Sequence, residues 1–318
     1  MANLTKIAES EPRLNRKGSI LKTKVFPNWV LYLFCLAGII ITIIFHYVPI
    51  YGVQIAFREF SPRLGMTGSP WVGWQHFERF FASPLARRTI ANTLIISAYQ
   101  LVAGFPIPIL LALLLNSFRR ARYRKVIQTV TYAPHFISTI VMAGMVILFL
   151  SPGSGVVNTI IGFFGVQPIN FMMDSSLWRH IFVWSGIWQT MGFSSVLYFA
   201  TLSGINPEYY EAAKVDGASK LKCIIHLEIP MLVPMMTMML ILSFGGLMSI
   251  GMERVLALQN DLNLSVSEVV STYTYRVGLI QNNMGFAAAI GLFNSAVNAV
   301  LLLAVNFITG KFFGRSLF

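Results

Sequence analysis

The stretch Thr89–Leu115 reads TIANTLIISAYQLVAGFPIPILLALLL and contains no charged residue. About 20 consecutive apolar residues are enough to cross the roughly 30 Å of hydrocarbon in a bilayer as an α-helix. Soluble domains rarely carry an uncharged run of this length, because they need charged side chains to cover their surface. This stretch therefore predicts a membrane-spanning helix, and it sets the fold class of the chain.

Five further segments have the same apolar character. They are Trp29–Tyr47, Val126–Leu150, Trp178–Leu202, Met231–Ile250 and Gly285–Thr309. Backbone N–H and C=O groups in hydrocarbon must be satisfied within the segment, so each segment is expected to be a helix. A β-barrel is excluded because its strands would alternate polar and apolar residues, which these runs do not. The sequence predicts an all-α integral membrane protein with six transmembrane helices.

The composition of the whole chain agrees with this fold class. Of its 318 residues, 55% are hydrophobic and only 11% are charged, and the mean hydropathy is +0.66. Ordinary soluble domains are about 25% charged. This composition excludes a soluble enzyme, a disordered protein and a secreted disulfide scaffold. The two cysteines, Cys35 in an apolar run and Cys223 in a polar loop, are not expected to form a disulfide.

The distribution of basic residues predicts the orientation in the membrane. The net charge is +12, and most of the 24 Lys and Arg residues lie in the two tails and in the second and fourth connections. Cytoplasmic loops carry an excess of Lys and Arg, so both termini are expected in the cytoplasm, although Arg87 and Arg88 go against the rule. This explanation of the basic charge requires no nucleic-acid partner. Residues 1–27 are the expected cytoplasmic tail, and residues 28–318 are the expected six-span domain with an uncleaved signal-anchor.

The fourth connection differs from an ordinary short loop. From Asn206 to Pro230 it reads NPEYYEAAKVDGASKLKCIIHLEIP. Pro207 suits the first turn of a helix and acidic side chains suit its positive end, so a helix is expected over Pro207–Val215. Gly217 would end it, and a second helix over Ser219–Glu228 would stop at Pro230. Such a helix–turn–helix suits docking to a soluble partner, but a solvated loop explains the residues equally well.

The residues of this loop resemble a known motif. Glu211-Ala212-Ala213, Asp216-Gly217-Ala218 and Pro230 have the spacing of the EAA loop, here residues 203–230, which marks permease subunits of binding-protein-dependent ABC importers. The chain departs from the family pattern only in having Leu227 and Ile229 where Ile and Leu are usual. Further segments are similar to that family: Asn92-Thr93-Leu94, Tyr132-Ala133-Pro134, and Leu202 to Pro207. Pro49-Ile50-Tyr51-Gly52 with Ala56-Phe57 resembles the subgroup serving complex oligosaccharides and polysaccharides.

The resemblance implies a multi-pass bacterial cell-membrane protein that works by alternating access. The short helix would dock into an ATPase subunit as a coupling helix between the fourth and fifth spans, with Glu211 making a polar contact and Gly217 a tight turn. The implied coupling residues are Glu211, Ala212, Ala213, Asp216, Gly217, Ala218 and Pro230. The implied partners are a dimer of ABC ATPase subunits, a second related permease subunit and an extracytoplasmic solute-binding protein.

Catalysis is not expected in this chain. It contains no Gly-x4-Gly-Lys-Ser/Thr phosphate loop, so ATP and Mg would be used by the partner ATPase and no cofactor would bind here. No pattern of His and Cys indicates a metal site.

Polar and aromatic side chains inside the expected spans are candidate contacts for a sugar, because such side chains are costly in lipid. The candidates are Gln128, Thr131, His135, Trp184, Trp188, Gln189, Asn294 and Asn298. Amides that bridge helices and tryptophans that anchor the interface are the alternative explanation. The external arginines suggest an acidic sugar as a further hypothesis.

Two other classes of protein are alternatives to the importer. An ion-coupled secondary carrier that needs no ATPase usually buries acidic residues in its spans. The six expected spans contain no Asp or Glu, and His135 is the only titratable candidate at membrane depth. An intramembrane enzyme would need a catalytic constellation there, and none is evident. Both classes are therefore less favoured than the importer.

Overall fold

The computed structural model describes residues 29–118 and 120–313. The expected N-terminal tail, Arg119 and the last five residues lie outside this range, as do most of the basic residues of the two tails. The chain divides into two compact units, one ending at Gln54 and the other beginning at Ile55.

The described part of the first unit consists of apolar helix. Helix α1 covers Trp29–Thr42, a π-helical turn η3 follows over Ile43–Tyr47, and the 3-10 segment η4 begins at Val48 and ends at Phe57. Together they form one run, Val30–Phe57, that is long and apolar enough to span a membrane. The first expected span is thus helical, and the helix continues ten residues beyond its expected end at Tyr47.

The second unit contains helices throughout and no β-strand within the described residues. Its longer helices are α4 (Pro84–Gly104), α5 (Pro106–Ser117), α6 (Ala121–Tyr132), α7 (Thr139–Phe149), α9 (Ser175–Ser203), α12 (Ile229–Gly245) and α16 (Met284–Phe313). Its shorter helices are α2 (Gly65–Gly68), α3 (Gln75–Ala82), α8 (Val156–Gly162), α10 (Pro207–Val215), α11 (Lys220–Cys223), α13 (Met252–Leu258), α14 (Leu264–Ser267) and α15 (Val270–Tyr275). The segments η5 (Ala133–Phe136), η6 (Ile224–Glu228) and η7 (Arg276–Ile280) connect them.

Three runs of the second unit have the length and apolar character of a membrane span: Pro84–Ser117, Lys220–Gly245 and Met284–Lys311. They contain the second, most of the fifth and all of the sixth expected segment. The fourth expected segment lies within α9, which is not among these runs, and its sequence is interrupted by Arg179, His180 and Gln189. The described residues therefore form an all-helical chain with several membrane-length apolar helices, and the count of six stays a prediction.

The third expected span, Val126–Leu150, is not one straight helix. It is built from α6, η5 and α7, and the two arms are bent by 103°. Pro134 lies in η5, where it lacks the N–H that a continuing α-helix would need. Ser138 then starts α7 afresh, because its side chain accepts the Val141 N–H at 3.3 Å as an N-cap.

The prediction that Pro230 stops a helix is wrong. α11, η6 and α12 continue from Lys220 to Gly245 as one run. The π-helical turn η6 precedes the proline, and its wider backbone spacing tolerates a missing N–H that a regular α-helix would require. At its other end the run stops at Gly245, five residues before the expected end at Ile250.

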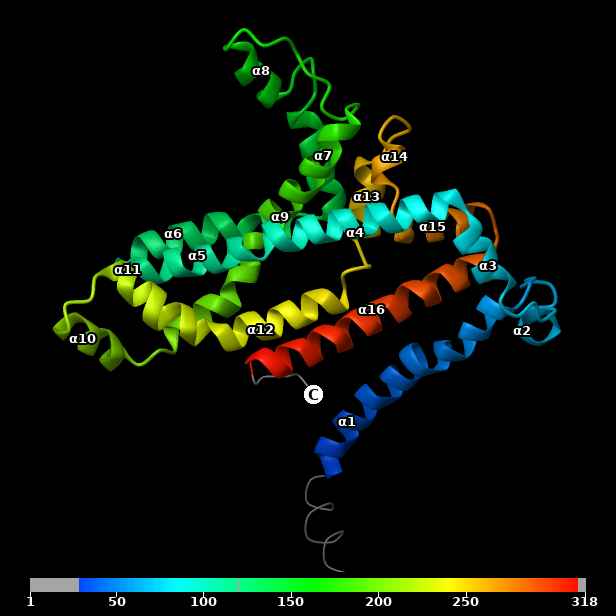
Figure 1. Ribbon diagram of the computed structural model, residues 1–318, viewed down its shortest axis with the longest axis horizontal. Helices are drawn as coiled ribbons and strands as arrows, with labels where there is room; N and C mark the ends of the chain where they lie inside the picture. Colours follow the sequence, from blue (N-terminus) through cyan, green and yellow to red (C-terminus); the bar gives the residue numbers. More distant parts are fainter. Residues whose placement is uncertain (1–28, 119, 314–318) are drawn as a thin grey trace, which may run out of the picture. The chain divides into compact units, whose positions relative to one another are not determined.

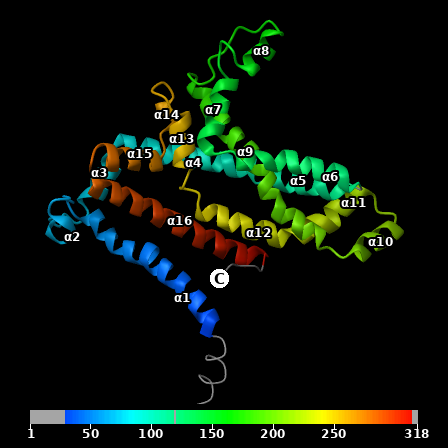
Figure 2. The same ribbon diagram turned by 180° about the vertical axis from the view of Figure 1, so that it is seen from behind.

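The core of the second unit lies between α9 and the helices around it. α5 packs along α9, and α12 packs along both α9 and α16 (Figure 1). Trp178 and Phe182 of α9 are fully buried with Val255 of α13, and the Trp178 Nε1 donates to the Leu258 carbonyl at 2.9 Å. Seen from behind, α10 lies beyond α11 and the start of α12, away from α13, α14 and α15 (Figure 2).

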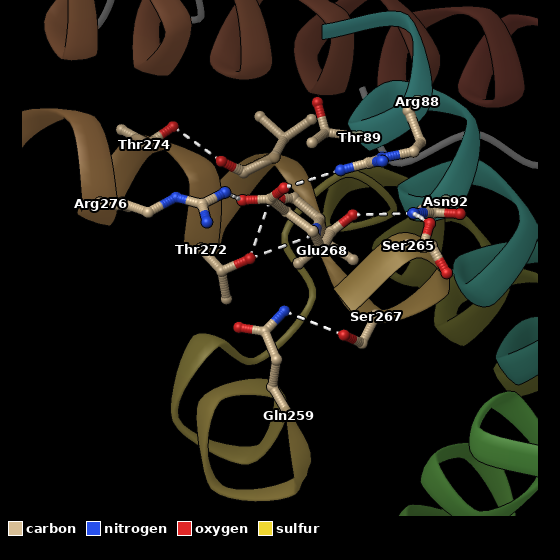
Figure 3. A network of polar contacts seen from close by, with 12 residues as sticks. Arg88, Thr89, Asn92, Gln259, Ser265, Ser267, Glu268, Thr272, Thr274 and Arg276 are labelled. Atoms are coloured by element: carbon tan, nitrogen blue, oxygen red, sulfur yellow. Dashed lines mark hydrogen bonds and ion pairs between the residues drawn. The ribbon is translucent and has the colours of Figure 1, made fainter. Parts of the chain in front are cut away.

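A buried carboxylate organises the segment between α14 and α15. Glu268 is 1% exposed, and Figure 3 shows Arg88 and Arg276 reaching its carboxylate from opposite sides. Asn92 of α4 donates to the Ser265 and Glu268 carbonyls, each at 3.0 Å. Its Oδ1 accepts from the Arg179 guanidinium at 2.8 Å. α4 and α9 thereby hold this segment in place.

Candidate functional site

The short helix α10 begins and ends where local chemistry requires. Asn206 is its N-cap, with its side chain accepting the Glu208 N–H at 3.1 Å, and Pro207 occupies the first turn. Both features satisfy or remove N–H groups that a helix start leaves unpaired. The observed bounds Pro207–Val215 are those expected from the sequence.

Gly217 ends α10 in a left-handed turn with φ of +71°. The Ala218 N–H bonds to the Ala213 carbonyl at 2.9 Å and the Gly217 N–H to the Lys214 carbonyl at 3.0 Å. This pair of bonds is the Schellman arrangement, which a glycine makes at the lowest cost because it has no β-carbon. The turn requires glycine for its φ alone, since no atom lies within 4 Å of where a β-carbon would stand.

The residues of the EAA loop remain open to a partner in the single chain. Glu211, Ala212, Asp216 and Gly217 are exposed, Ala213 and Ala218 are half-buried, and Pro230 is exposed at the start of α12. Apolar side chains of the same helix are also uncovered, with Val215 88% and Tyr209 53% exposed.

Glu211 lies beside a cavity of about 440 Å³ at the base of α10. Arg124 of α6 and Lys214 of α10 line the same cavity, together with Phe199 near the end of α9. The Arg124 guanidinium lies over the Phe199 ring, 5.5 Å from its centroid. Charged and aromatic side chains from α10, α6 and α9 therefore meet around this cavity.

A buried carboxylate that the sequence analysis missed fixes α10 to the long helices. Glu228 is 5% exposed, and its Oε1 accepts from Asn116 of α5 at 2.8 Å and from the Tyr210 hydroxyl of α10 at 3.2 Å. Burial raises the pKa of the Tyr210 hydroxyl, and the Glu228 charge raises it further, so the hydroxyl stays a donor. An acidic residue at the edge of an apolar run was the signal that could have identified this contact. Lys220 adds a bond to the Ser117 carbonyl at 2.8 Å.

A larger cavity of about 620 Å³ lies between α4, α5, α9 and α12. Polar side chains contribute to its wall, namely Ser97, Gln100, Thr190, Ser194, Tyr198, Ser243, Ser249 and Arg254. Ligand sites in proteins are commonly concave, largely apolar and of this size, with a few polar groups that orient the ligand. This cavity is therefore the candidate path for a solute within the second unit.

The structure places the predicted pathway residues outside the lining of this cavity. The residues of α9 that line the cavity are Ile187, Thr190, Met191, Phe193, Ser194, Val196, Leu197 and Tyr198, and Trp184, Trp188 and Gln189 are not among them. On α6, Gln128 and Thr131 are half-buried. Thr131 Oγ1 bonds back to the Ile127 carbonyl of its own helix at 2.8 Å.

Two of the predicted amides satisfy backbone groups where helices break. Gln189 donates to the Ile137 carbonyl, between η5 and α7, at 2.9 Å. Asn298 accepts the Met248 N–H at 2.8 Å and donates to Ser249 Oγ at 2.9 Å, beyond the end of α12. These hydrogen bonds join separate helical segments, as the alternative explanation of the amides expects. Asn294 differs, because its buried Oδ1 has no hydrogen-bond partner among the described residues.

Two of the predicted aromatic residues, His135 and Trp184, contact another aromatic side chain. His135 is exposed and stacks on Phe193 of α9, with ring centroids 4.2 Å apart. Trp184 is half exposed and donates from Nε1 to the Tyr99 hydroxyl at 2.9 Å. Trp188 is 42% exposed. A role of these residues in binding a sugar stays a prediction.

The described residues contain no group of three or more His, Cys, Asp or Glu side chains that could hold a metal ion.

Comparison with known proteins gives consistent matches. Residues 104–313 match the family described as binding-protein-dependent transport system inner membrane component. The chain is 38% identical over 292 residues to the polygalacturonan/rhamnogalacturonan transport system permease protein YteP of Bacillus subtilis (strain 168), covering 92% of this chain and 91% of that protein.

Solved structures match over nearly the same range. A chain from a bacterial ABC transporter involved in the import of the acidic polysaccharide alginate superposes with a TM-score of 0.85 and 37% identity, covering 92% of this chain and 99% of that one. A chain from the alginate transporter in complex with alginate pentasaccharide-bound periplasmic protein gives a TM-score of 0.85 and 36% identity, covering 94% of this chain and 99% of that one.

Proposed function

The chain belongs to the family of binding-protein-dependent transport system inner membrane components, and we propose that it is the permease subunit of an ABC importer for an oligosaccharide or polysaccharide fragment. A solute-binding protein would deliver the sugar, as a periplasmic protein accompanies the similar alginate transporter. A related second permease subunit and a dimer of ATPase subunits would complete the complex. None of the relatives described above is an ion-coupled carrier, so nothing favours that alternative.

Six crossings of the bacterial cell membrane, with both termini in the cytoplasm, fit this role. The bent pair α6 and α7 would make the third crossing and α9 the fourth. α10 would then lie at the cytoplasmic side, where ATPase subunits work. ATP and Mg would be bound by those subunits, because the sequence has no phosphate-binding loop of its own.

The observation that carries the coupling proposal is the fixed attachment of α10 to two long helices. Glu228 of the α11–α12 run accepts hydrogen bonds from Asn116 of α5 and from Tyr210 of α10. A displacement of α10 would therefore move α5 and α12 with it, because a buried carboxylate cannot leave its partners without a cost of about 1–3 kcal/mol or more. The movement of α10 on ATP-driven closure of the ATPase subunits would be transmitted through these bonds to the helices around the cavity between α4, α5, α9 and α12.

Two experiments test the proposal. The first is affinity purification of the chain from mildly solubilised native membranes, with mass spectrometry of the proteins that accompany it. We expect an ATPase, a second permease and a solute-binding protein. Recovery of the chain alone, intact and in good yield, would argue for a self-sufficient carrier.

The second experiment separates coupling from assembly. Glu211→Lys and Gly217→Leu are expected to abolish sugar uptake while the protein stays in the membrane, because the first reverses an exposed charge of α10 and the second cannot easily adopt φ of +71°. Glu59→Lys is the matched control, since Glu59 is exposed in the segment before α2. Unchanged uptake in both α10 variants would refute the coupling assignment.

A further inference from the structure

One cation projects into the large cavity of the second unit. Arg254 belongs to α13 and lines the cavity beside Gln100, Thr190 and Ser249. Its Cζ atom lies 4.2 Å from the centroid of the Phe182 ring, a cation–π contact that fixes one face of the guanidinium. Arg254 is the one charged residue in the cavity wall within the described part of the chain.

The Arg254 charge has no counter-ion in the wall. No Asp or Glu lines the cavity, and the ion pairs found in the described residues join Glu268 to Arg88 and Arg276. Among the described residues, the buried Nε of Arg254 has no hydrogen-bond partner, and the guanidinium has only a long contact of 3.4 Å to Gln100 Oε1. Removing a cation from water without pairing it is costly, so this arrangement leaves the guanidinium short of an acceptor.

The backbone of α9 makes room for this cation. Gly186 is buried opposite Arg254, and a β-carbon at this position would overlap the guanidinium. Any other residue at position 186 would push the guanidinium from its present place between the Phe182 ring and the cavity. The fold therefore holds an under-satisfied arginine at the wall of a space of about 620 Å³.

We propose that Arg254 binds a carboxylate of the transported sugar, and that the substrate of this permease is therefore an oligosaccharide containing uronic acid. The inference rests on the proposed function. A guanidinium offers N–H donors in a planar fork that matches the two oxygens of a carboxylate, and such charge-assisted pairs are the strong ones. Gln100 and the cavity hydroxyls are suited to the remaining polar groups of a sugar.

The test uses the whole complex of this chain with its ATPase, second permease and binding protein, reconstituted in liposomes. ATP-dependent uptake of an oligogalacturonate and of a neutral oligosaccharide of equal length is measured on the same preparation. Wild type is expected to prefer the acidic sugar. Arg254→Gln is expected to lower the ratio of acidic to neutral uptake by about 10- to 100-fold, the effect of one charge-assisted hydrogen bond.

Matched variants keep this test independent of folding. A ratio of two uptakes does not depend on the fraction of protein that is folded. Arg254→Lys keeps the charge but loses the planar fork, and it is expected to recover part of the ratio. Arg122→Gln removes an exposed arginine of the second connection that does not line the cavity, and it is expected to leave the ratio unchanged.

The outcomes separate this inference from the function on which it rests. ATP-dependent uptake with the same ratio in wild type and Arg254→Gln would overturn the role of Arg254 and leave the importer function standing. Preference of wild type for the neutral sugar would overturn the substrate class. A complete wild-type complex that moves neither sugar with ATP would overturn both proposals.

Discussion

Asn92 is a single buried side chain that satisfies three polar groups. Its amide donates to the Ser265 and Glu268 carbonyls and accepts from Arg179. Asn92→Ala would leave all three without this partner, and each unsatisfied buried group costs about 1–3 kcal/mol. We expect a lower unfolding temperature by several degrees in detergent, measured by intrinsic fluorescence. Gln281→Ala, at an exposed amide, is the control, and equal unfolding temperatures in the two variants would contradict this account.

The raised pKa of the Tyr210 hydroxyl predicts a loss of stability at alkaline pH. Burial, with the Glu228 charge beside it, raises the pKa of its hydroxyl above the usual 10.0. Above that value the unfolded chain loses the proton first, so the folded state binds more protons and the free energy of unfolding falls as pH rises. Unfolding temperatures of wild type should fall faster than those of Tyr210→Phe from about pH 10 upward. Parallel pH curves would show that the hydroxyl is not held in its protonated form.

At the residue scale, helix ends and turns could be predicted from the sequence. The groups to which a polar side chain forms hydrogen bonds could not. The bounds of α10 and the turn at Gly217 follow from residues within a few positions of each other. Gln189 is different, because its sequence position does not say that its amide faces the Ile137 carbonyl rather than a sugar. Arg254 and Glu228 lie outside the expected spans, so hydropathy alone does not identify them as polar residues at membrane depth.

At the element scale, the close packing of α9 against α6 depends on Gly192. A β-carbon there would overlap the backbone carbonyl of Thr131, which cannot move without shifting α6. Gly192→Ala is expected to destabilise the protein by about 1–3 kcal/mol. Gly144→Ala is the matched control in α7, where no atom lies within 4 Å of the new carbon, so helix propensity should stabilise it by about 0.5–1 kcal/mol. Thermal unfolding of both variants measures the two effects, and a shared sign would contradict the packing argument.

Prolines show why element boundaries were predicted only in part. Pro134 and Pro230 both fall in apolar runs, yet the chain bends by 103° after the first and continues as a helix through the second. The difference lies in the neighbouring backbone: Gln189 satisfies a carbonyl freed at the bend, whereas the π-helical turn η6 absorbs Pro230. Hydropathy averages over such a run and does not detect either feature, so Val126–Leu150 was expected to be one helix.

For the whole molecule, the bend between α6 and α7 decides the number of membrane crossings. If the pair crosses, the segment after it lies on the opposite side from the segment before α6. If it re-enters on the same side, every later segment changes sides, and α10 moves away from the cytoplasm. The excess of Lys and Arg in the second and fourth connections favours a crossing, because both connections then lie in the cytoplasm.

Cysteine labelling in intact cells tests this last prediction. In a chain carrying Cys35→Ser and Cys223→Ser, single cysteines are introduced at the exposed positions Arg122, Val166 and Lys222. With a true crossing, a membrane-impermeant maleimide should reach only Val166→Cys before permeabilisation and all three afterwards. Labelling of all three in detergent controls for expression. Val166→Cys is the informative site, because a re-entrant pair would leave it as inaccessible as Arg122→Cys and would expose Lys222→Cys instead. That reversed pattern would remove the coupling role of α10, since a helix outside the cell cannot reach an ATPase that uses cytoplasmic ATP.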